Sequence, residues 1–270
     1  MEILLTVDIG NTNITIGAFE NDVLIKTFRI GSKSKYTTDE LNFILKNMIE
    51  DNKIQIDKIS GISMCSVVPT ITESYINSLK YITGINDKNF LNISPGVKTG
   101  IKIHYDRIND VGADRIVDAV AGGLIYGRPL IIVDIGTATV FDAIDADGNY
   151  LGGSISPGLE ISSESMISNT SQLRKFELKP PEKVIGKNTV QSLQSGFMFG
   201  FSDLISGMIQ RFKNEIITNE ENIKVVATGG LCDLIAPLTD SFDYVDKNLT
   251  LTGLKKLYEL NIKKNYDKNK

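Results

Sequence analysis

The pattern of apolar and polar positions is similar in the two halves of the chain. Three short apolar runs of strand character open each half, at residues 3–7, 14–19 and 23–28 and at residues 130–133, 140–144 and 150–155. Polar turns separate these runs, and the Asp147-Gly148 pair in the second half is a strong hairpin signal. We therefore expect both halves to begin with three consecutive β-strands.

Segments with helical spacing follow these strands. Apolar side chains recur every three or four positions along residues 39–49 and 111–124, so each segment is predicted to bury one helix face. Further strands are expected at residues 59–68 and 223–227, and further helices at residues 193–212, 231–236 and 251–260. Strands that alternate with helices indicate an α/β protein. We divide it into an N-terminal lobe, residues 1–117, and a C-terminal lobe, residues 118–270.

A short motif is repeated where the first strand of each half ends. Residues 7–13 read Val-Asp-Ile-Gly-Asn-Thr-Asn, and residues 133–139 read Val-Asp-Ile-Gly-Thr-Ala-Thr. Glycine lets the backbone of such a turn approach a ligand, and successive N–H groups can hold phosphate oxygens. Asp8 and Asp134 can each hold a cation that neutralises those phosphates. Together with the Thr-Gly-Gly turn at residues 228–230, the repeat predicts two phosphate turns and a nucleotide cleft between two similar lobes.

Composition narrows the possible classes of protein. The 270 residues carry a formal charge of −4, which argues against a protein that binds nucleic acid through a basic surface. No apolar run approaches the roughly 18 residues of a membrane span, and the N-terminus has no signal-peptide pattern. Cys65 and Cys232 are too few for a disulfide framework, so we expect small core residues in a cytoplasmic protein. The single histidine, His104, excludes multi-histidine zinc sites and is expected to be structural or exposed.

Two common phosphate-binding motifs are absent. Residues 186–189 read Gly-Lys-Asn-Thr, like the end of a P-loop, but the upstream glycine is missing and Pro181 stands there. No Gly-x-Gly-x-x-Gly run follows a predicted strand. P-loop and Rossmann interpretations therefore fail.

The two phosphate turns and the Thr-Gly-Gly turn resemble those of the actin, Hsp70 and sugar-kinase superfamily, and nearly the whole chain closely resembles the type III pantothenate kinases. The resemblance rests on residues 8–13, Tyr105 with 111–115, 134–139 with 141–142, 152–153 with 156–159, 185–189, 228–231 and 249–254. It implies the actin-like (ribonuclease H-like) kinase fold. It also implies ATP-dependent phosphorylation of pantothenate to 4'-phosphopantothenate, the first step of coenzyme A biosynthesis.

The resemblance also implies roles for individual residues. Asp114 corresponds to the family's general base, although its position alone equally suits a carboxylate stabilised by a helix N-terminus. Arg115 could bind the pantothenate carboxylate, the alternative being a surface arginine. The implied ATP contacts are Asp8, Ile9, Gly10, Asn11, Thr12, Asn13, Ile14, Thr15 and Thr137. The implied substrate contacts are Tyr105, Gly112, Ala113, Asp114, Arg115 and, from a second subunit, Thr189.

Metal ions are expected because neither phosphate turn contains a lysine. A divalent metal, Mg²⁺, is needed to neutralise the phosphates, and Asp8 is a candidate ligand. The resemblance implies that Asp134 binds a monovalent cation, K⁺ or NH₄⁺. Asp142 is expected to be a solvated strand residue, the alternative being that it supports the site.

The helix expected at residues 193–212 is apolar around much of its circumference. Its apolar positions are Leu193, Phe197, Met198, Phe199, Phe201, Leu204, Ile205, Met208, Ile209 and Phe212. Gly196, Gly200 and Gly207 would allow another helix to approach closely. We expect this helix to be buried twice, once in a homodimer with composite active sites, as the resemblance also implies. The alternative is a central helix of one large lobe.

Two other functions stay open. One is a non-enzymatic regulatory relative with the same fold, which the loss of Asp114 or of a phosphate turn would favour; none is lost. The other is a kinase for another small hydroxy acid.

Overall fold

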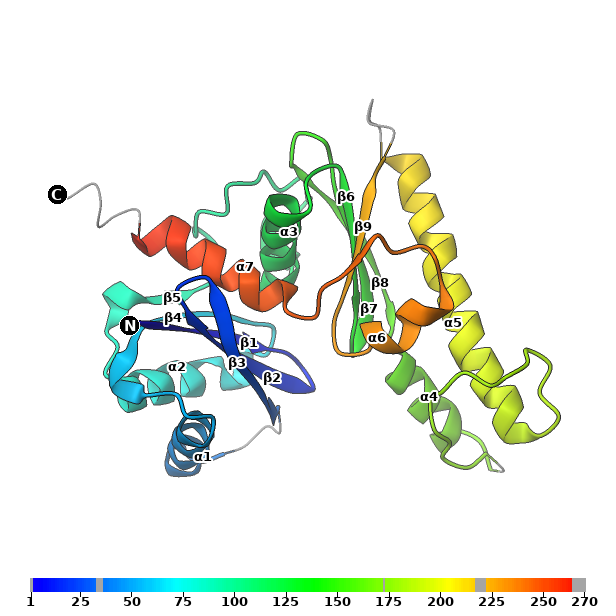
Figure 1. Cartoon of the computed structure of the whole chain (residues 1–270), viewed down its shortest axis with the longest axis horizontal. Coiled ribbons are helices and arrows are strands. Elements are labelled where there is room, and N and C mark those ends of the chain that lie inside the picture. The colour runs from blue at the N-terminus through cyan, green and yellow to red at the C-terminus, as the bar shows by residue number, and fades with distance from the viewer. Residues whose placement is uncertain (1, 33–35, 172, 217–221, 264–270) are drawn as a thin grey trace. The chain divides into compact units, whose positions relative to one another are not determined.

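A computed structural model describes residues 2–32, 36–171, 173–216 and 222–263, and the chain forms two compact units (Figure 1). The first unit comprises Met1–Gly100, Asp106–Ala121 and Thr250–Lys270. The second comprises Ile101–Tyr105 and Gly122–Leu249. Among the residues described, no helix is long and apolar enough to cross a membrane.

The first unit is built on a five-stranded mixed sheet. Its strands are β1 (Ile3–Ile9), β2 (Asn13–Glu20), β3 (Val23–Gly31), β4 (Ile59–Ser66) and β5 (Phe90–Asn92), in the order β3-β2-β1-β4-β5. β1 pairs antiparallel with β2 and parallel with β4. The central strand β1 is apolar at nearly every position because it is buried on both faces.

The second unit repeats this sheet. Its strands are β6 (Leu130–Ile135), β7 (Ala138–Ile144), β8 (Tyr150–Pro157), β9 (Lys224–Thr228) and β10 (Tyr244–Val245), in the order β10-β9-β6-β7-β8. β6 is antiparallel to β7 and parallel to β9, as β1 is to β2 and β4. The predicted duplication of three opening strands is therefore confirmed.

Helices cover both sheets. The first unit contains α1 (Thr38–Asp51), α2 (Pro69–Thr83), the start of α3 (Ala113–Ile125), nearly all of α7 (Leu249–Tyr258) and short 3₁₀ turns at Ile56–Lys58, Asp87–Asn89 and Ile108–Asp110. The second contains α4 (Leu159–Ser168), α5 (Thr189–Glu215), α6 (Cys232–Ile235) and a 3₁₀ turn at Ala236–Leu238. A capping box between Thr37 and Glu40 begins α1. Helices α2 and α4, at residues 69–83 and 159–168, are not among the helices expected from the sequence.

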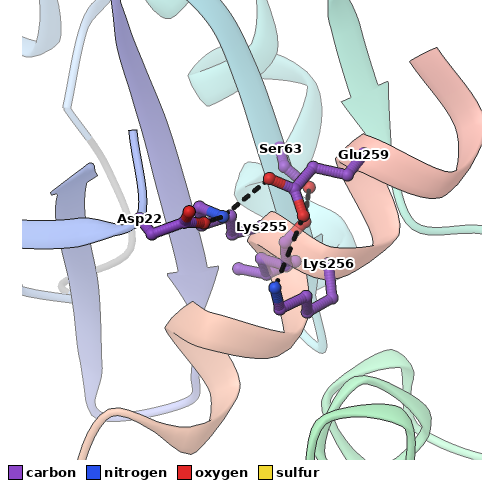
Figure 2. Close-up of polar contacts among 6 residues, drawn as sticks. Asp22, Ser63, Lys255, Lys256 and Glu259 are labelled. Carbon is purple, nitrogen blue, oxygen red and sulfur yellow. Dashed lines mark hydrogen bonds and ion pairs between the residues drawn. The ribbon is translucent and has the colours of Figure 1, made fainter. Parts of the chain in front are cut away.

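The C-terminal helix α7 packs on the first sheet, although the sequence division at residue 117 would assign it to the C-terminal lobe. Ser63 Oγ on β4 donates a hydrogen bond to Leu254 O at 2.8 Å (Figure 2). Lys255 is buried, and its Nζ lies 2.6 Å from both Asp22 Oδ1 and Glu259 Oε1. The boundary between the units falls at Ala121, inside α3. Helix α7 therefore belongs to the first unit because of its contacts with β4 and with Asp22, and not because of its position along the sequence.

Helix α5 supplies much of the second core. Met198, Phe201, Ile205 and Ile209 form a buried face at helical spacing and pack in one cluster with the apolar side chains of β6, β7 and β9. Leu204 is 41% exposed on another side of the helix. A Cβ added at Gly196, Gly200 or Gly207 would meet no atom within 4 Å. Within this chain, α5 therefore buries one face and leaves a stripe of small residues open.

Candidate functional site

The first phosphate turn connects β1 to β2, and its backbone is fixed by local hydrogen bonds. Gly10 N donates to Asn13 O at 3.0 Å. Ser32, which follows β3, donates from Oγ to Gly10 O at 2.6 Å and from its backbone N to Thr12 O at 2.9 Å. The side chains of residues 11–13 are exposed. These hydrogen bonds from Gly10 and Ser32 fix the backbone of the turn, while its polar side chains face solvent.

Asp8 lies at the end of β1 in a negatively charged, partly buried environment. Burial and the negative charge of Asp114 raise the pKa of Asp8 to about 7, and a hydrogen bond from Cys65 opposes this shift. The Cys65 thiol is buried on the neighbouring strand β4, directly opposite Asp8, and its Sγ donates to Asp8 Oδ1 at 3.4 Å. Burial, followed by the charges of Asp8 and Asp114, raises the pKa of that thiol well above its usual range. Cys65 therefore remains a neutral donor.

Asp114 lies in the first turn of α3. Its Oδ1 accepts a hydrogen bond from Arg115 N at 2.8 Å. Burial raises the pKa of Asp114, while the backbone N–H and the charge of Arg115 lower it, so that the net pKa lies above the usual value. A Cβ added at Gly112 would meet Asp114 Oδ1 at 2.5 Å, which explains why glycine precedes this helix. The first unit thus brings Asp114 close to the first phosphate turn.

Arg115 is 7% exposed, so the surface-arginine alternative is wrong. Cys65 was predicted to be a core residue, and its burial confirms that prediction. Its hydrogen bond to Asp8 could not be predicted from the sequence, because the register between two parallel strands is not encoded in a local pattern. The only sequence signal is that the strand expected at residues 59–68 carries the small polar side chains of Cys65 and Ser66 near its end.

The second phosphate turn is built around Asp134 at the end of β6. Gly136 N donates to Ala138 O at 3.0 Å, and Gly158 N donates to Thr137 O at 3.1 Å. The Thr-Gly-Gly turn lies directly against the strand end. Gly229 has φ +91°, and a Cβ there would overlap Asp134 Oδ1 and lie 2.6 Å from Ile135 O. The second unit therefore brings Asp134, Thr137 and residues 228–230 together.

Tyr105 and Thr189 belong to other elements of the second unit. Tyr105 is 36% exposed, and its ring centroid lies 6.4 Å from that of Tyr150. Thr189 is exposed at the start of α5, where the Asn188 side chain caps the helix by accepting from Gln191 N at 2.9 Å. His104 is exposed, which agrees with its expected place.

The expectation of a solvated Asp142 is wrong. Asp142 is 2% exposed, and its Oδ1 accepts a hydrogen bond from Tyr150 Oη at 2.7 Å. The physical reason is that its partner, the Tyr150 side chain on the neighbouring strand β8, is itself fully buried, so the carboxylate is enclosed with it.

The described parts of the chain contain no group of three or more His, Cys, Asp or Glu placed to hold a metal. The ATP-dependent activity that the resemblance implies requires a divalent metal. Mg²⁺ in such sites takes most of its ligands from phosphates and water, and only one or two from carboxylates. Asp8 fits this requirement because it is a partly buried carboxylate with a second negative charge, that of Asp114, nearby.

Comparisons with known proteins agree with this arrangement. A family model of type III pantothenate kinases matches residues 4–211. The type III pantothenate kinase of Geotalea daltonii is 42% identical over 265 residues, which cover 96% of this chain and 98% of the relative. That of Streptomyces coelicolor is 40% identical over the same shares.

A solved structure shows the same fold at low sequence identity. The inorganic polyphosphate/ATP-glucomannokinase from Arthrobacter sp. strain KM has a TM-score of 0.51 at 12% identity, over 96% of this chain and 99% of that chain. This likeness concerns the fold alone and confirms the expected actin-like kinase architecture. On the family match and the relatives that are at least 40% identical over nearly their whole length, the chain belongs to the type III pantothenate kinase family.

Proposed function

We propose that this chain transfers the γ-phosphoryl group of ATP to the primary hydroxyl of pantothenate, giving 4'-phosphopantothenate for coenzyme A biosynthesis. One observation carries the proposal: Asp114, a partly buried carboxylate with a raised pKa, shares a unit with the Asp8 turn and is close enough for its charge to raise the pKa of Asp8. Membership of the family supplies the substrates.

Each unit contributes a part of the chemistry that phosphoryl transfer needs, which is positioning, charge neutralisation and a proton acceptor. In the first unit, the Asp114 carboxylate accepts the proton of the substrate hydroxyl, and its raised pKa makes it a stronger base than an exposed aspartate. Arg115, with Gly112 and Ala113, binds the acid substrate. Residues 8–15 hold ATP phosphates on backbone N–H groups and polar side chains.

In the second unit, Thr137 contacts ATP and the Thr-Gly-Gly turn receives the adenosine part, while Tyr105 contacts pantothenate. We assign a monovalent cation, K⁺ or NH₄⁺, to Asp134, and Mg²⁺ to Asp8. Bound with ATP, the divalent ion neutralises phosphate charge. The chain's own residues orient the phosphates and move the proton.

The direct test uses purified protein with ATP, MgCl₂, KCl and pantothenate, with the product identified by mass. We expect 4'-phosphopantothenate from the wild type and almost none from Asp114→Asn. Other small hydroxy acids, offered under the same conditions, test the alternative substrate. No phosphorylated product under any ion condition would exclude an active kinase and favour the regulatory relative.

We further propose a homodimer with composite sites. The support is the open face of α5, where Gly196, Gly200 and Gly207 have free space beside them and Leu204 is exposed. Thr189 is exposed at the start of the same helix, and we assign it to the substrate site of a partner subunit. An isologous dimer would then use Asp114 and Thr189 from different subunits at each site.

Subunit exchange tests this arrangement. Asp114→Asn mixed with Thr189→Arg should regain activity, because one site in each heterodimer is fully wild type. A monomer by light scattering, or no recovery after proven exchange, contradicts the composite site.

We place the enzyme in the cytoplasm with no nucleic-acid or membrane partner, in keeping with its free, buried cysteines and its negative net charge.

A further inference from the structure

Tyr105 ends a short segment that is attached to the edge of the second sheet. Ile103 forms a parallel bridge with Tyr150 at the start of β8. Both backbone groups of Tyr150 are used, because its N donates to Lys102 O at 2.8 Å and its O accepts from His104 N at 2.8 Å. The backbone next to Tyr105 is therefore fixed by one residue, Tyr150.

The same residue is also fixed through its side chain. The Tyr150 ring is fully buried, and its hydroxyl donates to Asp142 Oδ1 at 2.7 Å. Asp142 is itself buried on β7, a strand with neighbours on both sides. A hydrogen bond from a buried hydroxyl to a carboxylate is stronger than one between neutral groups. It therefore restrains the orientation of the Tyr150 ring.

A β-bulge in β8 brings the backbone of Gly152 close to the Tyr105 ring. Ile144 pairs with Tyr150 and Ala143 with Gly152, so Leu151 is an extra residue between them. Gly152 has φ +120°, a conformation that favours glycine, and a Cβ placed there would lie 3.5 Å from Tyr105 Cε2. The Tyr105 ring thus packs on Gly152 and against the Tyr150 ring, with part of its surface exposed.

We propose that Tyr150 and Asp142 are positioning residues for Tyr105, and that they hold its ring so that the exposed part meets the acid substrate. Neither touches the reacting atoms. Their effect passes through the attachment of residues 102–104 and through ring-to-ring contact. This inference rests on the proposed function, which makes Tyr105 a contact for pantothenate.

The first experiment separates binding of the acid substrate from the other steps. Tyr150→Phe removes only the hydroxyl and keeps the ring and the backbone bonds. We expect the KM for pantothenate to rise by up to about fivefold, since the loss of one hydrogen bond sets the upper limit, while kcat and the KM for ATP stay within about twofold.

Tyr126→Phe is the matched control. It removes another Tyr–Asp hydrogen bond of the second unit, from Tyr126 Oη to Asp246 Oδ2 at 3.0 Å, and should change none of the three constants. If Tyr150→Phe does not fold, Asp142→Asn weakens the same bond from the other side and should raise the KM for pantothenate in the same direction.

The second experiment observes Tyr105 without any substrate. 3-Fluorotyrosine is introduced at position 105 alone, and its ¹⁹F signal is recorded in otherwise wild-type protein, in Tyr150→Phe and in Tyr126→Phe. We expect one narrow signal that shifts or broadens only in Tyr150→Phe. An unchanged signal overturns the proposal, and so does a changed signal with no rise in the KM for pantothenate. Wild-type protein that does not phosphorylate pantothenate would refute the proposed function instead, and the ¹⁹F signal would still decide the positioning.

Discussion

Replacing Asp8 by asparagine should abolish activity and make the protein more stable at neutral pH. The carboxylate lies in a partly buried site beside Asp114, and these surroundings raise its pKa from 3.8 to about 7. A group whose pKa is raised on folding resists ionisation in the fold, so its charged form destabilises the native state. The isosteric amide of Asp8→Asn removes the charge and can still accept a hydrogen bond from Cys65.

The size and sign follow from this pKa. Below pH 3.8 Asp8 is protonated in both the folded and the unfolded state, so the substitution gains nothing there. Above pH 7 the full cost of ionisation is present, which corresponds to about 4 kcal/mol at most. The variant's advantage should therefore grow between about pH 4 and pH 7 and then stay constant. At about 2–4 °C per kcal/mol for a chain of this size, the Tm should rise by about 10 °C at pH 8.

The assay is thermal unfolding without nucleotide or divalent metal, from pH 4 to pH 8.5, for the wild type, Asp8→Asn and Asp57→Asn. Asp57 is an exposed carboxylate of the same unit and serves as control. The difference between wild type and Asp8→Asn should grow with pH in this range, and Asp57→Asn shows what the loss of an exposed carboxylate does by itself. A variant less stable than wild type at pH 8, or equally stabilised at pH 4 and pH 8, would refute the reasoning.

Three further predictions follow from the same structure. Asp114→Asn should lower kcat by about 10²–10⁴-fold and leave the Kd for ATP, measured by calorimetry, nearly unchanged. If Asp134 holds a monovalent cation, turnover should fall when sodium replaces potassium, and equal rates in the two buffers would remove that site. Gly61→Ala should destabilise the protein by about 1–3 kcal/mol in urea unfolding, because its Cβ would overlap the Tyr258 hydroxyl under α7. Adding Tyr258→Phe should recover part of that loss, and no recovery would place the strain elsewhere.

Local patterns predicted the strands and the turns well. The apolar runs found β1, β2, β3, β6, β7 and β8, and the repeated motif located both strand-end aspartates. Helix α2 has helical apolar spacing at Ile71, Tyr75 and Leu79, but it begins at Pro69, which from the sequence only marks the end of the preceding strand. Helix α4 has little amphipathic pattern to detect, since only Leu159 and Ser163 are buried.

Long-range contacts could not be predicted in the same way. The hydrogen bond from Cys65 to Asp8 joins residues that are 57 positions apart in the sequence. The membership of α7 in the first unit depends on Ser63 and Asp22, which are far away in the sequence. Such contacts are decided by how the elements pack, and a window of ten to twenty residues does not contain that information.

The strand-end aspartates of the two units meet different neighbours on the adjacent parallel strand. Asp8 lies opposite Cys65 on its parallel neighbour, as Asp134 lies opposite Thr228. After Cys65, the backbone next bonds to β1 at Val67, whose N donates to Ile9 O. After Thr228, it bonds to β6 only at Leu231, whose N donates to Ile135 O. The second connection is thus one residue longer, and it places Gly229, with φ +91°, against Asp134. In the first unit a thiol contacts the carboxylate and helps to bury it, while in the second a bare backbone does. Burial beside the thiol and the charge of Asp114 therefore make the Asp8 carboxylate resist ionisation, whereas the Asp134 carboxylate meets the backbone of Gly229.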